Sequence, residues 1–455
     1  MGLTREIGGF LADMRFERVP EDAVVTVCTG FTDCVGVMLA GLTEPVSPAA
    51  ARAAGISFDV DALAILGAKG PAPDLGLIYG TAAHALDFDD TGLSGHPSAV
   101  LVPAILAEAA DTGADGRKMI AAYVAGYEIW AELIRRDLDQ HHKKGWHPTA
   151  MFGTLAAAGA SAVLRGLDSA QASRAVAIAG SLAGGIVSNF GTMTKPFQVG
   201  RAVQSGLLAA RLAEAGISAA DDAIEHELGF LQAISPRGRV DSKSKSRLGT
   251  EWRILALGIN VKLYPMCYAA HRSLDAMIDL RQAYQLAPSD IEEVEVELSA
   301  TQATILRNHR PQNALDAKFS IEFAMAAAAI SGRCSGSEFN KAFVRRPDVQ
   351  DFFAKVKTRA DAAPDPEEPS LSLHDRVHLS LRDGRRISSE PVRYARGHFK
   401  RPIESELLWQ KFQNCAAGVI GIDQARQLFD AFQYLPRLRS IRDLAAQGAR
   451  AALAR

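Results

Sequence analysis

The sequence predicts a mainly α fold, in which a large all-helical domain carries an inserted, smaller α+β domain. Alanine, leucine and glycine dominate up to about residue 235, and alternation of β-branched residues is almost absent there. A period of two, typical of half-buried strands, first appears after His271. After Pro402 the pattern is helical again, which indicates a return to the first domain. We therefore assign residues 1–268 and 401–455 to the helical domain and 269–400 to the insertion.

Composition excludes several classes of protein. The chain has 455 residues, 48% of them hydrophobic and 22% charged, which suits a globular protein of two or three domains. A net charge of −2 gives no basic surface for nucleic acid, so no nucleic-acid partner is expected. The five cysteines form no CxxC pair and fit a reducing, cytoplasmic location. We see no signal peptide and no run of about 18 apolar residues, so no membrane association is expected.

The helical domain is expected to contain long helices with readable start signals. Pro20 precedes Glu21 and Asp22, which suit the first turn of a helix. Ser169 is the expected cap of a later helix. The helical runs are 19–42, 100–111, 116–137, 154–165, 170–180 and 200–215, and near the C-terminus 403–415 and 424–435.

The inserted domain mixes strands and helices. Residues 291–299 alternate apolar and acidic side chains, as a half-buried strand does. Residues 375–392 predict two strands joined by a turn at Asp383 and Gly384. We expect a helix at 317–330, a helical stretch at 338–356 with a break near Pro347, and a loop at 362–370.

A first polar island, at residues 81–97, has three open interpretations. If it is helical, His84, Asp87 and Thr91 share one face, and a carboxylate could orient and charge a histidine. It could also be a polar turn at a helix C-terminus, with Asp90 as a cap. The third interpretation is a metal site, because histidines and aspartates lie close together in the sequence.

Two further islands carry a histidine and a lysine. In GWHPT, His147 precedes a helix N-terminus, which favours anions, although a solvated basic loop explains the pattern equally well. His141 and His142 nearby are expected at the surface. In GTMTKP, Lys195 could act as a base or an anion anchor if it is partly buried, but most lysines are solvated.

The fourth island, YPMCYAAH, lies where the helical pattern ends. A boundary between domains favours a binding site, so His271 is a candidate, although it could simply begin a helix. Cys267 is interpreted as a structural thiol, since no feature of the sequence lowers its pKa.

Taken in order, the motifs resemble the MmgE/PrpD family. The resemblance extends from about Pro20 to Phe412 and rests on ALDFDDT with GHPS, GWHPT, GTMTKP, YPMCYAAH and AKFSIEF. The family includes 2-methylcitrate dehydratase, cis-aconitate decarboxylase and iminodisuccinate epimerase. The resemblance implies that the inserted domain is a lid, that the active site lies in the cleft between domains, and that the enzyme is a homodimer without cofactor or metal.

The resemblance also implies the site residues. The catalytic set is Asp87, His96, His147, Lys195 and His271, and substrate binding is assigned to Thr91, Thr194, Lys262 and Gln198. Lys195 and His271 are the expected acid–base pair, while His96, oriented by Asp87, binds or protonates the substrate. Two departures stand out: Gln198 replaces a histidine found in many members, and Phe323 falls where the decarboxylase has a tyrosine.

The expected function is that of a dehydratase-like lyase, which removes a proton beside a carboxylate of a small di- or tricarboxylate. Charge developing on the substrate calls for cations in a water-poor site, and Lys195, His147 and His271 could supply them. Epimerisation of an amino-dicarboxylate such as iminodisuccinate is the first alternative. A metal-dependent hydrolase and a non-catalytic carboxylate-binding protein are the others. The hydrolase would use His84, Asp87, Asp89 and His96.

Overall fold

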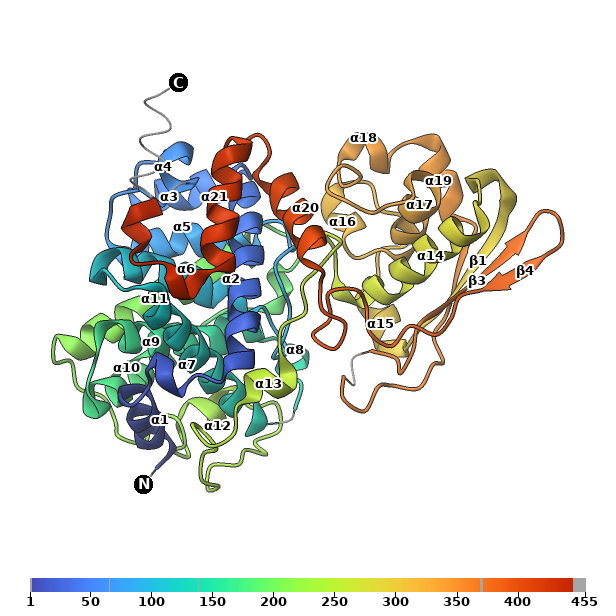
Figure 1. Cartoon of the computed structure of the whole chain (residues 1–455). Helices are drawn as coiled ribbons and strands as arrows, with labels where there is room; N and C mark the ends of the chain where they lie inside the picture. The colour runs from blue at the N-terminus through green and yellow to red at the C-terminus, as the bar shows by residue number, and fades with distance from the viewer. Residues whose placement is uncertain (1, 65, 138, 369–370, 445–455) are drawn as a thin grey trace. The chain divides into compact units, whose positions relative to one another are not determined.

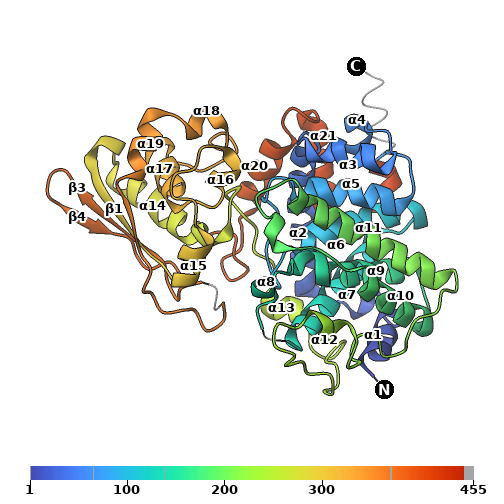
Figure 2. The ribbon, with the colours of Figure 1, turned by 180° about the vertical axis from the view of Figure 1, so that it is seen from behind.

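The structure is a computed structural model that describes residues 2–64, 66–137, 139–368 and 371–444. It is mainly α, with one small four-stranded sheet, which confirms the expected class. The chain divides into two compact units (Figures 1 and 2). The helical unit runs up to Ile259 and resumes at Ser405, and the second unit is Asn260–Glu404.

The helical unit is built almost entirely from α-helices, and the long runs expected from the sequence are present. Its helices are α1 (Leu3–Ala12), α2 (Glu21–Leu42), α3 (Val46–Ala54), α4 (Val60–Ala64), α5 (Ala72–His84), α6 (Pro97–Thr112), α7 (Gly116–Arg135), α8 (His141–Lys144), α9 (Pro148–Arg165), α10 (Ser169–Leu182), α11 (Thr194–Glu214), α12 (Phe230–Ile234), α13 (Arg253–Leu257), α20 (Ser405–Ala416) and α21 (Ile422–Gln433). One start signal is corrected. The cap of α10 is Asp168, whose carboxylate accepts from Gln171 N–H, because Ser169 is already the first helical residue.

Small residues let α5 and α11 pack closely, and these two helices carry site residues. A Cβ atom on Gly80 would lie 2.9 Å from the Cα atom of Gly200. A Cβ atom on Gly200 would lie 2.2 Å from the carbonyl oxygen of Leu77. Neither glycine can therefore gain a side chain without separating the helices. The crossing brings the C-terminal end of α5 and the N-terminal end of α11 into one region.

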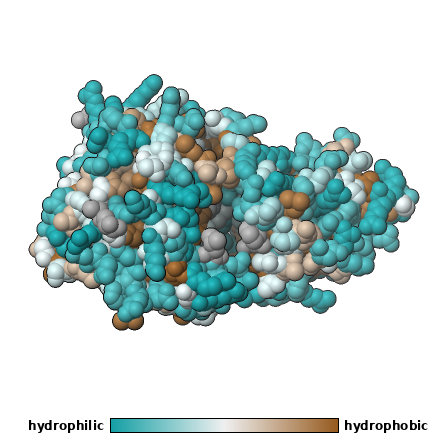
Figure 3. All heavy atoms as spheres, turned by 90° about the horizontal axis from the view of Figure 1, so that it is seen from below, coloured by the Kyte–Doolittle hydropathy of each residue, from teal (hydrophilic) through white to brown (hydrophobic). Residues whose placement is uncertain are grey.

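Apolar side chains are mostly inside. Helix α2 is long and apolar enough to cross a membrane by length and composition, but 72% of that window is buried against the rest of the protein. This burial is typical of a core helix. The face drawn in Figure 3 is mainly hydrophilic, with hydrophobic residues scattered in small groups.

The second unit packs helices against the sheet. Its elements are α14 (His271–Tyr284), β1 (Ile291–Glu297), α15 (Ala300–Ile305), α16 (Ala314–Ala317), α17 (Ile321–Ser331), α18 (Lys341–Val344), α19 (Pro347–Phe353), β2 (Val356–Arg359), β3 (Arg376–Leu381) and β4 (Arg386–Ser388). The strand order is β2-β1-β3-β4, with β2 parallel to β1 and the other pairs antiparallel. Val294 on β1 pairs with Leu379 on β3, and both are buried, as the period of two predicts.

The stretch 338–356 is helical with a break just before Pro347, as expected: α18 ends at Val344, and Pro347 begins α19 at a position that needs no N–H donor. Its end differs from expectation, because Val356 already belongs to β2. Strand β2 is short and largely exposed, so only its pairing with β1 defines it. Phe323 is fully buried against Phe339 and Phe343, which gives it a packing role in the core.

Candidate active site

Five side chains predicted from three separate motifs lie together in the helical unit. His96 and His147 occupy the N-cap positions of α6 and α9. Lys195 and Gln198 lie in the first turns of α11. Asp87 lies in the turn that follows α5. Three helix N-termini therefore contribute, and the partial positive charge of such ends favours an anionic ligand.

The turn after α5 is not helical, so the expected helical face of His84, Asp87 and Thr91 is wrong. Helix α5 ends at His84, and Asp87 has a φ of 53°, in the left-handed region. A φ of this sign is uncommon for a residue with a side chain and persists only when surrounding contacts hold it. Thr91 Oγ1 donates to the carbonyl of Gly95 at 3.0 Å, which ties the turn together.

Asp89 links two histidines. Nδ1 of His84 lies 3.0 Å from Asp89 Oδ1, and Nδ1 of His96 lies 2.8 Å from Asp89 Oδ2. His84 and Asp89 are fully buried, and the two imidazole rings are 4.4 Å apart. The carboxylate that orients His96 is therefore Asp89 and not Asp87, whose Oδ1 is 3.9 Å from His96 Nε2.

Protonation in this group follows from burial and charge. Burial lowers the pKa of His84 to about 4, with Asp89 opposing that effect and Lys195 adding to it. Burial alone would raise the pKa of Asp89, but the two imidazoles outweigh it and hold that pKa well below its usual range. Asp89 is thus an ionised acceptor, and His84 is a neutral ring that donates through Nδ1–H.

Lys195 is paired with Asp87. Its Nζ atom donates to Asp87 Oδ1 at 3.0 Å and lies 5.2 Å from the centre of the Phe190 ring. The Asp87 and Lys195 side chains are only 12% and 11% exposed, so the pair is largely shielded from water. Lys195 thus meets the condition of partial burial on which its functional interpretation depends, and the ion pair supplies the charge that offsets its desolvation.

His147 is held by two neighbours. Its Nδ1 atom is 2.7 Å from Gln198 Oε1, and its ring meets Phe190 edge-on at 4.9 Å. Burial, and then His84 and Lys195, hold the pKa of His147 well below its usual range. His147 is therefore neutral, which corrects the expectation that it supplies a positive charge.

Asp90 does not cap the helix that the polar-turn interpretation assigned to it. Its Oδ1 atom accepts from Ser98 N–H at 3.2 Å, in the first turn of α6, so it does not cap the C-terminus of α5. His141 is also corrected: it is 5% exposed and lies 3.3 Å from Asp137 Oδ2, whereas His142 is half-buried.

The remaining predicted residues are Thr194 in the helical unit and Lys262 and His271 in the second unit. Thr194 is exposed at the start of α11. Lys262 and His271 are both buried in the second unit, where His271 begins α14 between the rings of Tyr264 and Tyr268. Their part in the site stays a prediction.

A metal could in principle be held by four of these residues. Ligand atoms of His84, Asp87, Asp89 and His96 all lie within 4.8 Å of one another. In the structure, however, Lys195 already pairs with Asp87, and both imidazoles lie on Asp89. A divalent cation would have to replace these contacts, which makes a pure hydrogen-bond and ion-pair network the simpler interpretation.

Sequence reasoning missed two contributions. Asp89 appeared only among possible metal ligands, although a carboxylate five residues after His84 is close enough to meet it around a tight turn. Phe190 was not singled out, although it packs against both His147 and Lys195. Its position in NFGTMTKP, five residues before the lysine, was the available signal.

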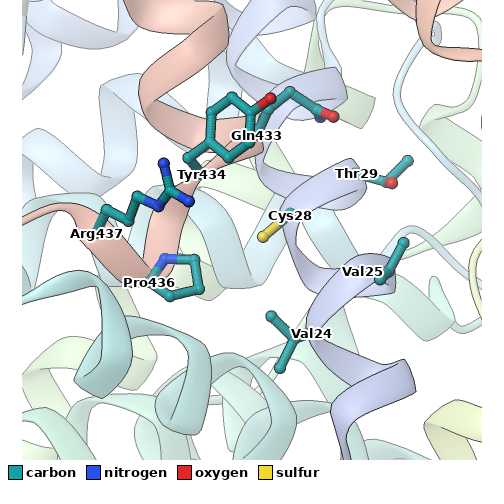
Figure 4. Close-up of a pocket in the computed structure, with 8 residues that line it drawn as sticks. All are labelled: Val24, Val25, Cys28, Thr29, Gln433, Tyr434, Pro436 and Arg437. Carbon is teal, nitrogen blue, oxygen red and sulfur yellow. The ribbon is translucent and has the colours of Figure 1, made fainter.

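A pocket elsewhere in the helical unit lacks such chemistry. It has a volume of about 220 Å³ and lies between α2 and the segment after α21, beside Cys28, Tyr434 and Arg437 (Figure 4). Burial raises the pKa of the Cys28 thiol to about 11, so it is not an activated nucleophile. None of the motif residues lines this pocket.

Comparison with known proteins gives two family matches and several relatives. Residues 5–243 match the MmgE/PrpD N-terminal domain, and residues 264–434 match the MmgE/PrpD C-terminal domain. The chain is 27% identical to human cis-aconitate decarboxylase over 376 residues, 79% of this chain and 76% of the relative. It is 26% identical to the Aspergillus terreus cis-aconitate decarboxylase over 375 residues, 77% and 75% of the two chains. A cis-aconitate decarboxylase-like protein of Aspergillus oryzae is 22% identical over 98% of this chain and 96% of its own.

Proposed function

The chain belongs to the MmgE/PrpD family, and from this premise we propose that it is a lyase that forms negative charge on a carbon beside a carboxylate of a small di- or tricarboxylate. Relatives named cis-aconitate decarboxylase indicate a lyase-type enzyme. The observation that carries the finer proposal is the shielded Lys195–Asp87 pair, which lies beside the Asp89-linked histidines.

Loss of carbon dioxide and loss of water make similar demands on such a site. In both, electrons left on the substrate carbon must be stabilised, and a proton must be supplied or removed. A fixed ammonium group in a water-poor region stabilises that charge far better than water does. We assign this role to Lys195 and retain His271 as its acid–base partner. His96, oriented by Asp89, binds or protonates the substrate.

The substrate is proposed to bind as an anion. The N-termini of α6, α9 and α11 and the ammonium of Lys195 are the features that favour carboxylates. We assign carboxylate contacts to Thr91, Thr194, Lys262 and Gln198, and we further propose a homodimer that needs no cofactor.

The experiment follows candidate substrates by NMR in deuterated water. Cis-aconitate, a 2-methylcitrate-like compound and iminodisuccinate are each incubated with the enzyme and with Lys195→Met. We expect net loss of carbon dioxide or water from one of the first two, and none with the variant. Deuterium entering one carbon of iminodisuccinate without net loss would instead establish an epimerase. A compound that raises the Tm without reacting would indicate a binding protein.

A further inference from the structure

We propose that Gln198 is a positioning residue that fixes His147 as the neutral Nδ1–H tautomer and so leaves Nε2 as an unprotonated acceptor. The inference begins with the orientation of the Gln198 amide. Gln198 Nε2 donates to the carbonyl oxygen of Ile186 at 3.1 Å. A carbonyl oxygen can only accept, so the NH₂ group must lie on this side and Oε1 on the other.

The tautomer of His147 follows from that orientation. Oε1 of Gln198 lies 2.7 Å from His147 Nδ1, and a carbonyl-type oxygen cannot donate. Nδ1 must therefore carry the proton. Because burial beside His84 and Lys195 keeps the ring neutral, Nε2 has none.

The backbone holds both partners in place. His147 N–H donates to Gly185 O at 3.0 Å, and Val187 N–H donates to Gly145 O at 2.9 Å. These two bonds fix the Ile186 carbonyl relative to the histidine. A Cβ atom on Gly185 would lie 3.1 Å from Gln198 Oε1 and 2.7 Å from Ala150 Cβ, so the absence of a side chain there permits the close approach.

This arrangement changes what His147 does for the substrate. A glutamine, unlike a histidine, stays uncharged at every accessible pH. Gln198 therefore holds His147 in a single tautomer. His147 is thereby a proton acceptor and not a cation that binds a carboxylate. When it accepts a proton, a new N–H bond forms at Nε2 and the electron pair of the broken bond stays on the substrate. This last step rests on the proposed function, whereas the tautomer does not.

The test reads the tautomer directly and without substrate. Protein labelled with ¹⁵N-histidine is studied by NMR that correlates the ring nitrogens with ring protons, and His147→Asn assigns the signal. We compare wild type, Gln198→Leu and the matched control Gln204→Leu. Gln204 lies on the same helix and also makes two side-chain hydrogen bonds, to Asp74 and Arg201.

We expect the Nδ1–H pattern in wild type and Gln204→Leu, and its loss or mixing in Gln198→Leu. An Nε2–H pattern in wild type, or an unchanged Nδ1–H pattern in Gln198→Leu, would overturn the inference. If Gln198→Leu does not fold, Gln198→Glu replaces it. A carboxylate at this position should keep Nδ1–H and make the ring doubly protonated at a higher pH than in wild type. If the protonation of the ring does not move to a higher pH in Gln198→Glu, the inference is overturned.

Turnover provides a second readout. Once a substrate is known, kcat should fall about 10²-fold in Gln198→Leu and stay at the wild-type value in Gln204→Leu. If wild type turns over none of the candidate compounds, the proposed function fails while the NMR result still decides the inference. If wild type has the Nδ1–H tautomer but Gln198→Leu keeps full activity, Gln198 has only a structural role and its part in catalysis is rejected.

Discussion

The ammonium group of Lys195 lies 3.0 Å from Oδ1 of Asp87, although 108 positions separate the two residues in the chain. One belongs to the first turn of α11 and the other to the strained turn after α5. Packing of α5 on α11 brings them together. The contact joins two motifs into one site and places a shielded positive charge beside His84 and His96.

Loss of the Lys195 charge should abolish most turnover. In Lys195→Met we expect kcat to fall by about 10² or more, because the substitution removes the shielded ammonium group that we assign to stabilising negative charge on the substrate. The exposed Lys118, changed to Met, is the matched control. Steady-state kinetics on protein of normal circular dichroism measures the effect, and wild-type turnover in Lys195→Met would reject the assignment.

Asp89→Asn should impair catalysis while preserving shape. An amide can accept through one oxygen only and presents an NH₂ group to the second imidazole, so one of the two histidines loses its partner. We expect kcat to fall roughly tenfold to 100-fold with a smaller change in KM. Equal kinetics in Asp89→Asn and wild type would show that Asp89 does not orient His96.

Asp90 should make stability fall as pH rises. Burial, with Asp33 and Asp89 nearby, raises the pKa of Asp90 to about 8 from an ordinary 3.8. Between these values the folded protein holds a proton that the unfolded chain has lost, so this group lowers the free energy of unfolding by about 1.4 kcal/mol per pH unit. Asp90→Asn keeps the acceptor for Ser98 N–H and removes this slope. Denaturant unfolding from pH 4 to 8 should show the free energy of unfolding of Asp90→Asn increasing relative to that of wild type as the pH rises. A difference between the two proteins that does not change with pH would contradict this prediction.

The buried charges of Lys411 and Asp33, next to the same turn, should contribute to stability as a coupled pair. Lys411 Nζ lies 2.5 Å from Asp33 Oδ1 and donates to the carbonyl of Phe88, between Asp87 and Asp89. Lys411→Met leaves a buried carboxylate without its cation and should cost roughly 3–5 kcal/mol of unfolding free energy. The double variant Asp33→Asn with Lys411→Met should recover part of that loss. Additive losses in a double-mutant cycle would mean that the two charges do not interact.

Removal of metal should leave turnover intact. The carboxylates of Asp87 and Asp89 already have Lys195 and the two imidazoles as partners, so they need no divalent cation. Once a substrate is identified, we expect the same kcat before and after exhaustive chelation, with metal content measured on both samples. Activity that disappears with the metal and returns with it would favour the hydrolase alternative.

The sequence by itself determined the local structure wherever one periodicity dominates. Helices such as α2 and α7, and the hairpin of β3 and β4, were predictable because their apolar spacing and turn residues act over neighbouring positions. Strand β2 was not, because a short exposed strand exists only through its hydrogen bonds to β1. The motifs likewise singled out Asp87, His96, His147 and Lys195 by residue type.

Only the tertiary structure decided which side chain meets which. Asp87 and Asp89 are two positions apart, and spacing alone cannot say which one orients His96, because the turn after α5 leaves the helical path at a positive φ. The neutral state of His147 likewise depends on burial beside His84 and Lys195, and the tautomer that we propose for it depends on the hydrogen bonds that Gln198 makes across the packed helices. Local periodicity fixes elements, whereas pairing and protonation depend on contacts between residues that are distant in the chain.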